Sequence, residues 1–358
     1  MLPYIHGQFG NASSGHAFGV REKEAVTVAR GRVAKLLGVS AEEIFFTGGG
    51  TESVNWAIKG VAEAAGKGHI VTTAVEHVVV LECCKWLEQR GFEVTYLPVD
   101  ATGVVGVAEV ESALRPDTIL VTVMHANNET GSVQPIKEIS ELCSARGIPM
   151  HSDCSQSACK LPIRLNEFPL SMCTLAGHKM YAPPGIGVLF IRQGTKVSNF
   201  MHGAGHERGR RPGTENTIHI VALGVAADIG ATHLDSNIAH MTAMRDMLHQ
   251  KLRQQWPALK LNGHPEQRLP NTLNVSIPNI MAADLVSKLG ESVLFSAGSA
   301  CHAGEARISH VLAAMGVARN EALGACRFSV GRYTTQEEVE RAAAAIITAV
   351  SQLASDTK

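Results

Sequence analysis

Short apolar runs alternate with helical patterning along the first half of the chain. The runs lie at residues 44–47, 70–73, 93–97, 119–124, 148–151, 172–175 and 187–191. Between them, apolar residues recur at helical spacing, most clearly over residues 78–89 and 136–145. Strands that are apolar on both faces and alternate with helices predict an α/β fold, in which helices sandwich a mostly parallel sheet.

The pattern changes after Gly213. One long helix is predicted from Thr217 to Trp256, and Pro257 ends it. Strands at 271–277 and 325–330, helices near 282–289 and from 336, and a Gly/Ser-rich loop at 296–304 follow. This mixture predicts a small α+β C-terminal domain. We expect a large domain over residues 10–235 and a small domain over 236–358 together with 1–9.

Composition and charge narrow the function classes. The 358 residues carry 32 Lys and Arg against 33 Asp and Glu, so the basic footprint of a nucleic-acid-binding protein is absent. No apolar run approaches the ~20 residues that span a bilayer, and the start lacks the features of a secretory signal. We expect a soluble, cytoplasmic protein without membrane partners, with an organelle as the alternative if the native start lies upstream.

Eight cysteines are too few for a disulfide scaffold, and none has C-x-x-C spacing. We expect most of them to be reduced and buried. His151 and Cys154 lie close in the sequence, but further ligands are missing. We therefore predict no metal site.

A glycine-rich turn follows the first predicted strand. Its sequence, Thr47-Gly48-Gly49-Gly50-Thr51-Glu52-Ser53, opens a helix. Glycines allow close approach of the backbone, and the N-terminus of a helix attracts anions. The segment suits a phosphate, but a tight turn with Thr51 as the helix cap explains it equally well.

Three further side chains come directly after predicted strands, where ligands bind in such sheets. His77, Asp153 and Lys179 follow the runs at 70–73, 148–151 and 172–175. Taken singly, His77 and Asp153 have ordinary structural explanations, such as a hydrogen-bonded structural histidine and a surface or helix-capping aspartate. Lys179, between Gly-His and a Pro/Gly-rich turn, does not have the pattern of a surface residue. Taken together with the phosphate cradle, they supply a stacking imidazole, an acid and an amine. Pyridoxal 5'-phosphate requires such a set, with a lysine for Schiff-base chemistry and an acid at the ring nitrogen.

Several segments resemble the cysteine desulfurase and selenocysteine lyase family, a part of aminotransferase class V among the fold-type I pyridoxal-phosphate enzymes. From Phe9 to about Glu340 the matching segments occur in family order. They are TGGGTES, VEH, ANNETG, HSDCSQ, GHKMYAPPGIG, HGAGHERGRRPGTEN, SAGSACHAG and CRFSVGRYTT.

The resemblance implies a role for each matching position. Lys179 holds the cofactor, His77 stacks on its ring, and Asp153 pairs with its nitrogen. Gln156 bonds its phenolic oxygen, and Lys179 or His77 moves protons. The cofactor phosphate is implied to bind Gly50, Thr51, His178 and Thr214 of the neighbouring subunit. The substrate carboxylate is implied to bind Asn128 and Arg327.

Cys301 stands where the family has its nucleophile, within the Gly/Ser-rich loop that the small domain carries. The composition of this loop predicts mobility. The resemblance implies that the Cys301 thiolate attacks the sulfur of L-cysteine, giving L-alanine and a persulfide for transfer to an acceptor protein. A homodimer that supplies sulfur for iron–sulfur cluster assembly or thio-modification is expected.

Two departures leave alternatives open. Ala176 stands where many desulfurases have a phosphate-binding serine, which selenocysteine lyases also lack. Relatives begin with an additional N-terminal strand, whereas this chain starts in what resembles the end of the first family helix. The alternatives are a selenocysteine lyase and a truncated, non-catalytic relative. The basic run Arg208 to Arg211 is interpreted as a loop at the subunit interface rather than a nucleic-acid patch.

Overall fold

The computed structural model describes residues 1–302 and 305–356; for residues 299–302, 305–307 and 356 it describes the backbone alone. The described chain forms two compact units. The first comprises Met1–Leu97, Val107–His125 and Pro135–Leu234, and the second Pro98–Gly106, Ala126–Gln134 and Asp235–Lys358.

A seven-stranded sheet forms the centre of the first unit, in the order β1-β7-β6-β5-β4-β2-β3. Its strands are β1 (Ile44–Thr47), β2 (His69–Thr73), β3 (Glu93–Leu97), β4 (Thr118–Thr122), β5 (Met150–Asp153), β6 (Met172–Ala176) and β7 (Gly187–Ile191). The pairs from β3 to β6 are parallel, and only β7 runs against both of its neighbours. The mostly parallel α/β sheet is therefore confirmed.

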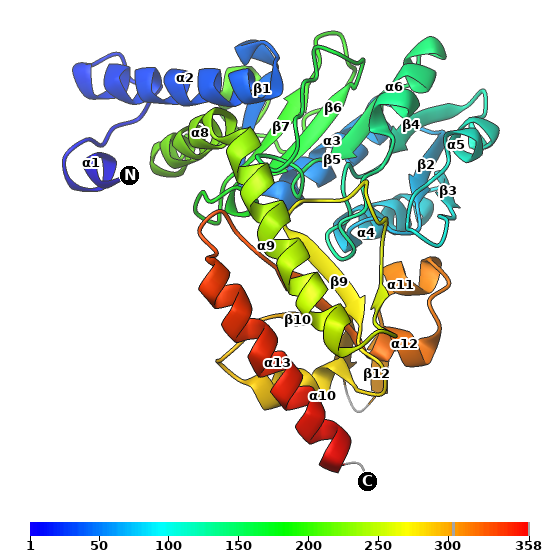
Figure 1. Cartoon of the computed structure of the whole chain (residues 1–358). Helices are drawn as coiled ribbons and strands as arrows, with labels where there is room; N and C mark the ends of the chain where they lie inside the picture. The colour runs from blue at the N-terminus through cyan, green and yellow to red at the C-terminus, as the bar shows by residue number, and fades with distance from the viewer. Residues whose placement is uncertain (303–304, 357–358) are drawn as a thin grey trace. The chain divides into compact units, whose positions relative to one another are not determined.

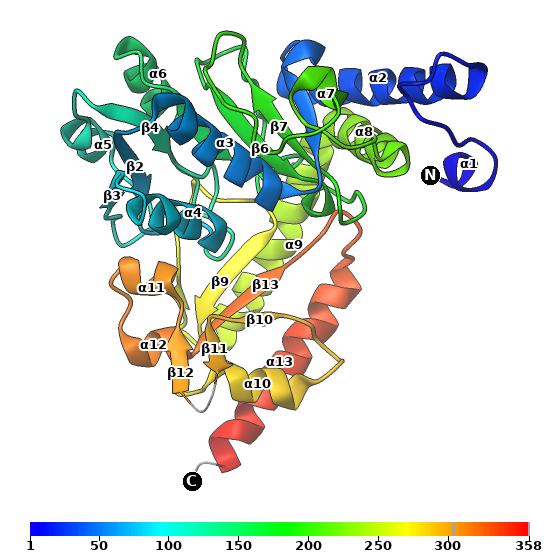
Figure 2. The same ribbon diagram turned by 180° about the vertical axis from the view of Figure 1, so that it is seen from behind.

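Helices cover both faces of this sheet, as Figures 1 and 2 show, with α3 and α4 on one face and α6 on the other. Trp56 and Ile58 of α3 are fully buried against Ile70 of β2 and Leu120 of β4, which forms the main core on that face. The helices are α1 (Leu2–His6), α2 (Ala17–Leu37), α3 (Gly50–Ala65), α4 (Val78–Glu88), α5 (Val107–Ala113), α6 (Ile136–Ala145), α7 (His206–Gly209) and α8 (Thr217–Thr232), with short 3₁₀ turns η1 (Ala41–Glu43) and η2 (Gly177–Lys179).

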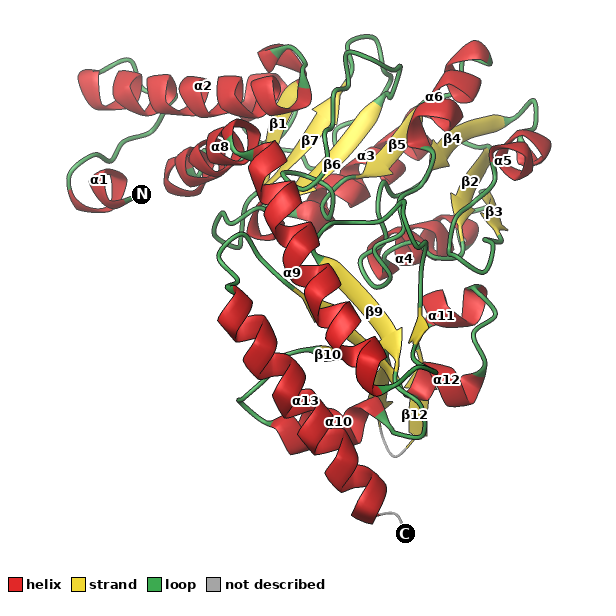
Figure 3. Ribbon diagram, viewed as in Figure 1, coloured by secondary structure: helices red, strands yellow, loops and turns green. Residues whose placement is uncertain are grey.

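The second unit is built on a four-stranded antiparallel sheet, ordered β10-β13-β9-β8. Its helices α9 and α13 lie on the same face of β9 and β13 (Figures 2 and 3) and share one core with α10. A separate hairpin pairs β11 with β12. The elements are β8 (Lys260–Leu261), β9 (Thr272–Ser276), β10 (Ser296–Ala297), β11 (Ser299–His302), β12 (Glu305–Ile308), β13 (Ala325–Ser329), α9 (Leu234–Gln255), α10 (Ala282–Leu289), α11 (His310–Ala314), α12 (Arg319–Leu323) and α13 (Gln336–Asp356).

The helix predicted from Thr217 to Trp256 is in fact two helices. α8 ends at Thr232, and His233 leaves the helical conformation with φ −110°. Polar and apolar residues continue at helical spacing on both sides, so the pattern did not reveal the break. Within the described residues no single helix is both long and apolar enough to cross a membrane; α8 and α9 meet the two criteria only as a pair, which is bent by 78°.

Short segments cross the predicted domain boundary. Residues 98–106 and 126–134 belong to the second unit, where the side chain of Gln134 accepts from Val105 N and donates to Gly103 O. Residues 1–9, expected in the small domain, belong to the first unit, in which α1 contacts α8. The equation of these units with a cofactor-binding domain and a catalytic-cysteine domain stays a prediction.

Candidate functional site

The carboxyl ends of the parallel strands gather the chemically interesting side chains of the first unit at one edge of the sheet. Gly50 follows β1, His77 follows β2, Asp153 is the last residue of β5, and Lys179 follows β6. Parallel strands end at the same edge, so strands distant in sequence bring their following residues to one place. This edge is the candidate site.

The turn between β1 and α3 forms a tight backbone cradle. Gly49, the residue before α3, has φ 153° and provides no side-chain cap. A Cβ on Gly187 of β7 would lie 2.6 Å from the carbonyl carbon of Gly49, so the two backbones touch. The first N–H groups of a helix have no partner within it and point outward. Thr51 lies in the exposed first turn and is not the cap, so the interpretation as a capped turn is wrong.

Asp153 ends β5 and is half-buried. One carboxylate oxygen accepts from Ser155 N at 2.9 Å, and the carbonyl accepts from His125 N at 2.9 Å. These bonds fix the aspartate at the strand end, with a buried glutamate, Glu76, close enough to interact with it electrostatically.

Glu76 is fully buried, and its burial together with the nearby Asp153 charge raises its pKa to about 8. The Glu76 carboxyl accepts from Thr73 Oγ1 at 2.8 Å and from Met124 N at 2.9 Å. A carboxyl with this pKa carries its proton at neutral pH. Sequence reasoning missed Glu76, because its burial depends on β4 packing beside β2.

Lys179 is exposed and follows β6 in the turn η2. Its backbone carbonyl accepts a hydrogen bond of 2.9 Å from Nζ of Lys160, which also donates to Gln156 O at 3.0 Å. Lys160 is buried, and burial, followed by repulsion from Lys179, lowers its pKa to about 8. The pKa of His178 is lowered by burial and by the same Lys179 charge. Lys160 therefore links the segment that contains Gln156 to the segment that contains Lys179, a role that sequence reasoning also missed.

His77 precedes α4 and caps it. Its Nδ1 accepts from Val79 N at 3.2 Å, which leaves the ring proton of a neutral imidazole on Nε2. The His77 side chain is exposed, and so is Thr214, which lies shortly before α8. Both are open to a ligand or to another chain.

The arginines at residues 208–211 form hydrogen bonds and an ion pair within the first unit. Arg208 donates to Ile44 O at 2.8 Å and Arg210 to Val197 O at 3.0 Å. Arg211 pairs with Glu52 of α3 at 2.8 Å. These guanidinium groups tie the segment to β1, to the start of α3 and to the segment after β7.

Three predicted site residues lie in the second unit. Arg327 on β13 donates to Asn128 O at 2.9 Å and to Ser296 Oγ at 2.8 Å, so these residues are joined there. Cys301 lies on β11, with its backbone paired to Ala306, rather than in an open loop. Its side chain is outside the described residues, whereas the other seven cysteines are buried. Among the described residues no group of three or more His, Cys, Asp and Glu could hold a metal ion.

The first unit fits pyridoxal phosphate by the chemistry of its donors. A helix N-terminus with a close glycine backbone suits the phosphate, Asp153 suits a protonated ring nitrogen, and the exposed Lys179 amine suits the aldehyde carbon. Asp153 ends β5, Lys179 follows the neighbouring strand β6, and α3 follows β1 of the same sheet.

Comparisons with known proteins agree with this chemistry. Residues 1–342 match the model of the aminotransferase class-V family. The cysteine desulfurase IscS of Methanosarcina thermophila is 44% identical over 344 residues, which cover 95% of this chain and 85% of that protein. A solved NifS-like protein has a TM-score of 0.92 at 37% identity, and the match covers 98% of this chain and 94% of that protein's chain. The structure of SspA in complex with cysteine has a TM-score of 0.81 at 36% identity, and the match covers 93% of this chain and 94% of the SspA chain.

Proposed function

Because the chain belongs to the aminotransferase class-V family and is a pyridoxal-phosphate-dependent cysteine desulfurase within it, we propose that Lys179 and Cys301 perform its two chemical tasks. Lys179 binds the cofactor and moves protons, and Cys301 accepts the sulfur. The single observation that carries the proposal is the position of Lys179 after β6, next to the strand that ends in Asp153.

The substrate proposed is L-cysteine, and the products are L-alanine and a persulfide. The Cβ–S bond of the substrate and the S–H bond of Cys301 break, while a Cβ–H bond and an S–S bond form. Carbon is reduced and sulfur is oxidised by the same electron pair, so no external redox partner is needed. A relative solved in complex with cysteine supports this substrate class.

The bound cofactor supplies an electron sink next to the substrate amine. Asp153, fixed by Ser155 N at 2.9 Å, would hold the ring nitrogen in its protonated form. The Gly50 backbone, Thr51 and His178 would bind the phosphate, and Gln156 would bond the phenolic oxygen. His77, whose Nδ1 accepts from Val79 N, would stack on the ring, and Lys179 or His77 would move protons.

Arg327 and Asn128 are proposed to bind the substrate carboxylate. The guanidinium presents planar N–H donors that match a carboxylate. Its bonds to Asn128 O and Ser296 Oγ hold it in one orientation within the second unit, which favours a defined binding geometry.

A homodimer with shared sites and a separate sulfur-acceptor protein complete the proposal. Thr214 is exposed, as a residue that reaches the phosphate of a neighbouring subunit must be. A persulfide on Cys301 requires an acceptor, because otherwise each subunit would stop after one turnover. Selenocysteine, which differs from cysteine by a single heavier atom, is the competing substrate.

The test is alanine release from L-cysteine and from L-selenocysteine, measured side by side with added pyridoxal phosphate. Lys179→Ala should abolish the absorption band of the lysine-bound cofactor, with Lys196→Ala as the control. Cys301→Ser should keep that band and lose cysteine turnover, whereas Ser299→Ala on the same strand should keep both. Unchanged cysteine turnover in Cys301→Ser would remove its role as sulfur acceptor, and turnover of selenocysteine alone in the unaltered chain would assign a lyase.

A further inference from the structure

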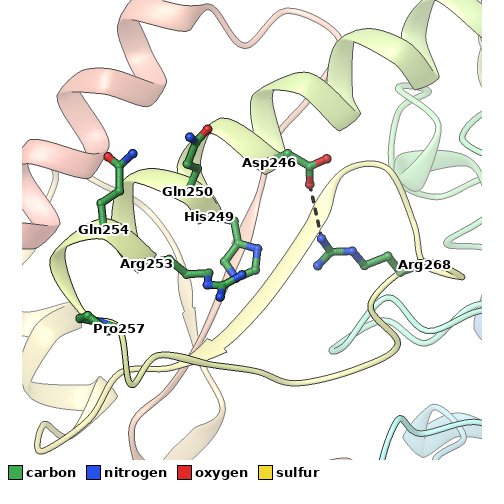
Figure 4. Close-up of a pocket in the computed structure, with 7 residues that line it drawn as sticks. All are labelled: Asp246, His249, Gln250, Arg253, Gln254, Pro257 and Arg268. Carbon is green, nitrogen blue, oxygen red and sulfur yellow. Dashed lines mark hydrogen bonds and ion pairs between the residues drawn. The ribbon is translucent and has the colours of Figure 1, made fainter.

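The second unit has a pocket lined mainly by polar and charged residues. Its volume is about 620 Å³, and Figure 4 shows side chains of α9 on one side and Arg268 on the other. The lining residues are Asp246, His249, Gln250, Arg253, Gln254, Pro257 and Arg268. None of them is among the residues assigned to cofactor or substrate.

Arg268 is a buried cation with unused hydrogen-bond donors. Its side chain is only 6% exposed, and among the described residues neither Nε nor Nη1 has a hydrogen-bond partner. Nη2 makes one long contact, 3.4 Å to Asp246 Oδ1. Burial of a charged group without partners is costly, so a complementary group is expected to complete this site.

The nearby carboxylate of Asp246 is shared between Arg268 and a second arginine, Arg245. The same Oδ1 atom of Asp246 accepts from Arg245 Nε at 2.8 Å. Arg253 adds a further guanidinium to the lining, and Arg245 is itself buried. Asp246 thus pairs with both Arg245 and Arg268, and it is the one acidic residue among the described residues of the lining. The pKa of His249 is lowered by burial and by Arg268 and Arg253, so the neutral imidazole adds no further positive charge.

The backbone around Arg268 is fixed before any ligand binds. Arg268 forms a β-bridge with Ser132, and its N–H donates to Glu266 O at 2.8 Å. Val133 N donates to Gln267 O at 3.0 Å. A donor held in place by its backbone loses little entropy on binding, which favours affinity.

We propose that this pocket binds a small organic anion, a molecule of metabolite size that carries a phosphate or carboxylate group. Arginine donors match the oxygens of both groups. A volume of about 620 Å³ exceeds the space that one inorganic phosphate fills and lies among those of small-molecule sites. The glutamines of α9 and Pro257 provide polar and apolar contacts for the remainder of such a ligand.

Calorimetric titration of the holoenzyme tests the site, because bound pyridoxal phosphate occupies the other phosphate-binding position. The probes are inorganic phosphate, citrate and a short glutamate-rich peptide. We expect saturable binding of citrate or phosphate, weakened about tenfold or more by Arg268→Gln and severalfold by Arg253→Gln. Arg253 is exposed, so its replacement leaves the fold intact even if Arg268→Gln does not. Arg341→Gln, on the exposed side of α13, is the matched control and should bind as the unaltered chain does.

The imidazole of His249 provides an independent reading in an NMR titration. An anion bound between Arg253 and Arg268 should raise the pKa of His249, and Arg253→Gln should need a severalfold higher anion concentration to reach half of that shift. Absence of saturable binding by both small anions, or equal binding by Arg253→Gln and the control, would overturn the proposal. Tighter binding of the peptide than of either small anion would overturn it as well, because the surface would then recognise protein.

Discussion

The ammonium group of Lys160 donates a hydrogen bond of 2.9 Å to the backbone carbonyl of Lys179. A second bond from the same nitrogen reaches Gln156 O at 3.0 Å. A buried cation thus connects the segments after β5 and β6. Any change at Lys160 should therefore be transmitted to the position of Lys179.

Replacement of Lys160 by Met should destabilise the protein by about 1–3 kcal/mol, because two buried carbonyls lose their donor. The variant should also bind pyridoxal phosphate more weakly, since the segment that carries Lys179 is no longer held. Denaturant unfolding and cofactor titration measure the two effects. Lys196→Met, at an exposed lysine, is the control and should change neither. A stable Lys160→Met protein with unaltered cofactor affinity would contradict the positioning role.

The same variant predicts a pH dependence. The pKa of Lys160 falls from 10.5 to about 8 in the folded protein, so between these values the unfolded state binds more protons. The free energy of unfolding of the unaltered chain, relative to that of Lys160→Met, should then rise with pH across this window. Below pH 8 the offset between the two proteins should not change with pH. Unfolding curves of both proteins at several pH values provide the comparison; parallel profiles would refute the assignment.

For Glu76 we expect the opposite pH dependence of the free energy of unfolding. Its pKa rises from 4.5 to about 8 on folding, so the folded state binds more protons across that range, and its stabilising contribution is complete below pH 4.5 and is lost as pH rises to about 8. Glu76→Gln keeps the shape and cannot ionise. Relative to the unaltered chain, the variant should gain stability between these pH values, on the order of a few kcal/mol at the upper end. Glu63→Gln on α3, which is exposed, should follow the unaltered chain.

The candidate site was predictable where it depends on strand order alone. His77, Asp153 and Lys179 each follow an apolar run, and parallel strands bring such positions to one edge. Lys160 and Glu76 were not predictable, because a buried charge next to an apolar run has the same sequence pattern as an exposed one. Their burial results from packing between segments distant in the chain.

The boundaries of the second unit show the same limit. Residues 126–134 belong to it because Ser132 pairs with Arg268, which is distant in sequence and has no pattern that announces the pairing. The break at His233 lacks a glycine or proline, the residues that usually signal the end of a helix. Local periodicity identifies elements, whereas their ends and partners depend on tertiary contacts.

Ala176→Ser should strengthen cofactor binding. Ala176 ends β6, and its Cβ would lie 3.1 Å from a Cβ on Gly50, so a hydroxyl there would face the glycine cradle. One added hydrogen bond to phosphate is worth about 0.5–1.5 kcal/mol, or about a two- to tenfold lower dissociation constant. Equilibrium dialysis of pyridoxal phosphate measures this, with Ala108→Ser on the exposed side of α5 as the control. Unchanged or weaker binding in Ala176→Ser would show that the phosphate lies elsewhere.

Mixed dimers test whether Thr214 serves the neighbouring subunit. Lys179→Ala alone should be inactive, and Thr214→Ala alone should bind cofactor about tenfold more weakly or worse, since a hydrogen bond to a charged group is worth about 1.5–3 kcal/mol. In a mixed dimer, the subunit with Thr214→Ala keeps its lysine and receives an intact Thr214 from its partner. At limiting cofactor, such dimers, isolated through two different affinity tags, should regain about half of the unaltered activity per dimer. The control pairs Thr214→Ala with a Lys179→Ala/Thr214→Ala chain and should regain nothing. If the mixed dimer is no more active than this control, Thr214 acts within its own subunit or has no contact with the phosphate.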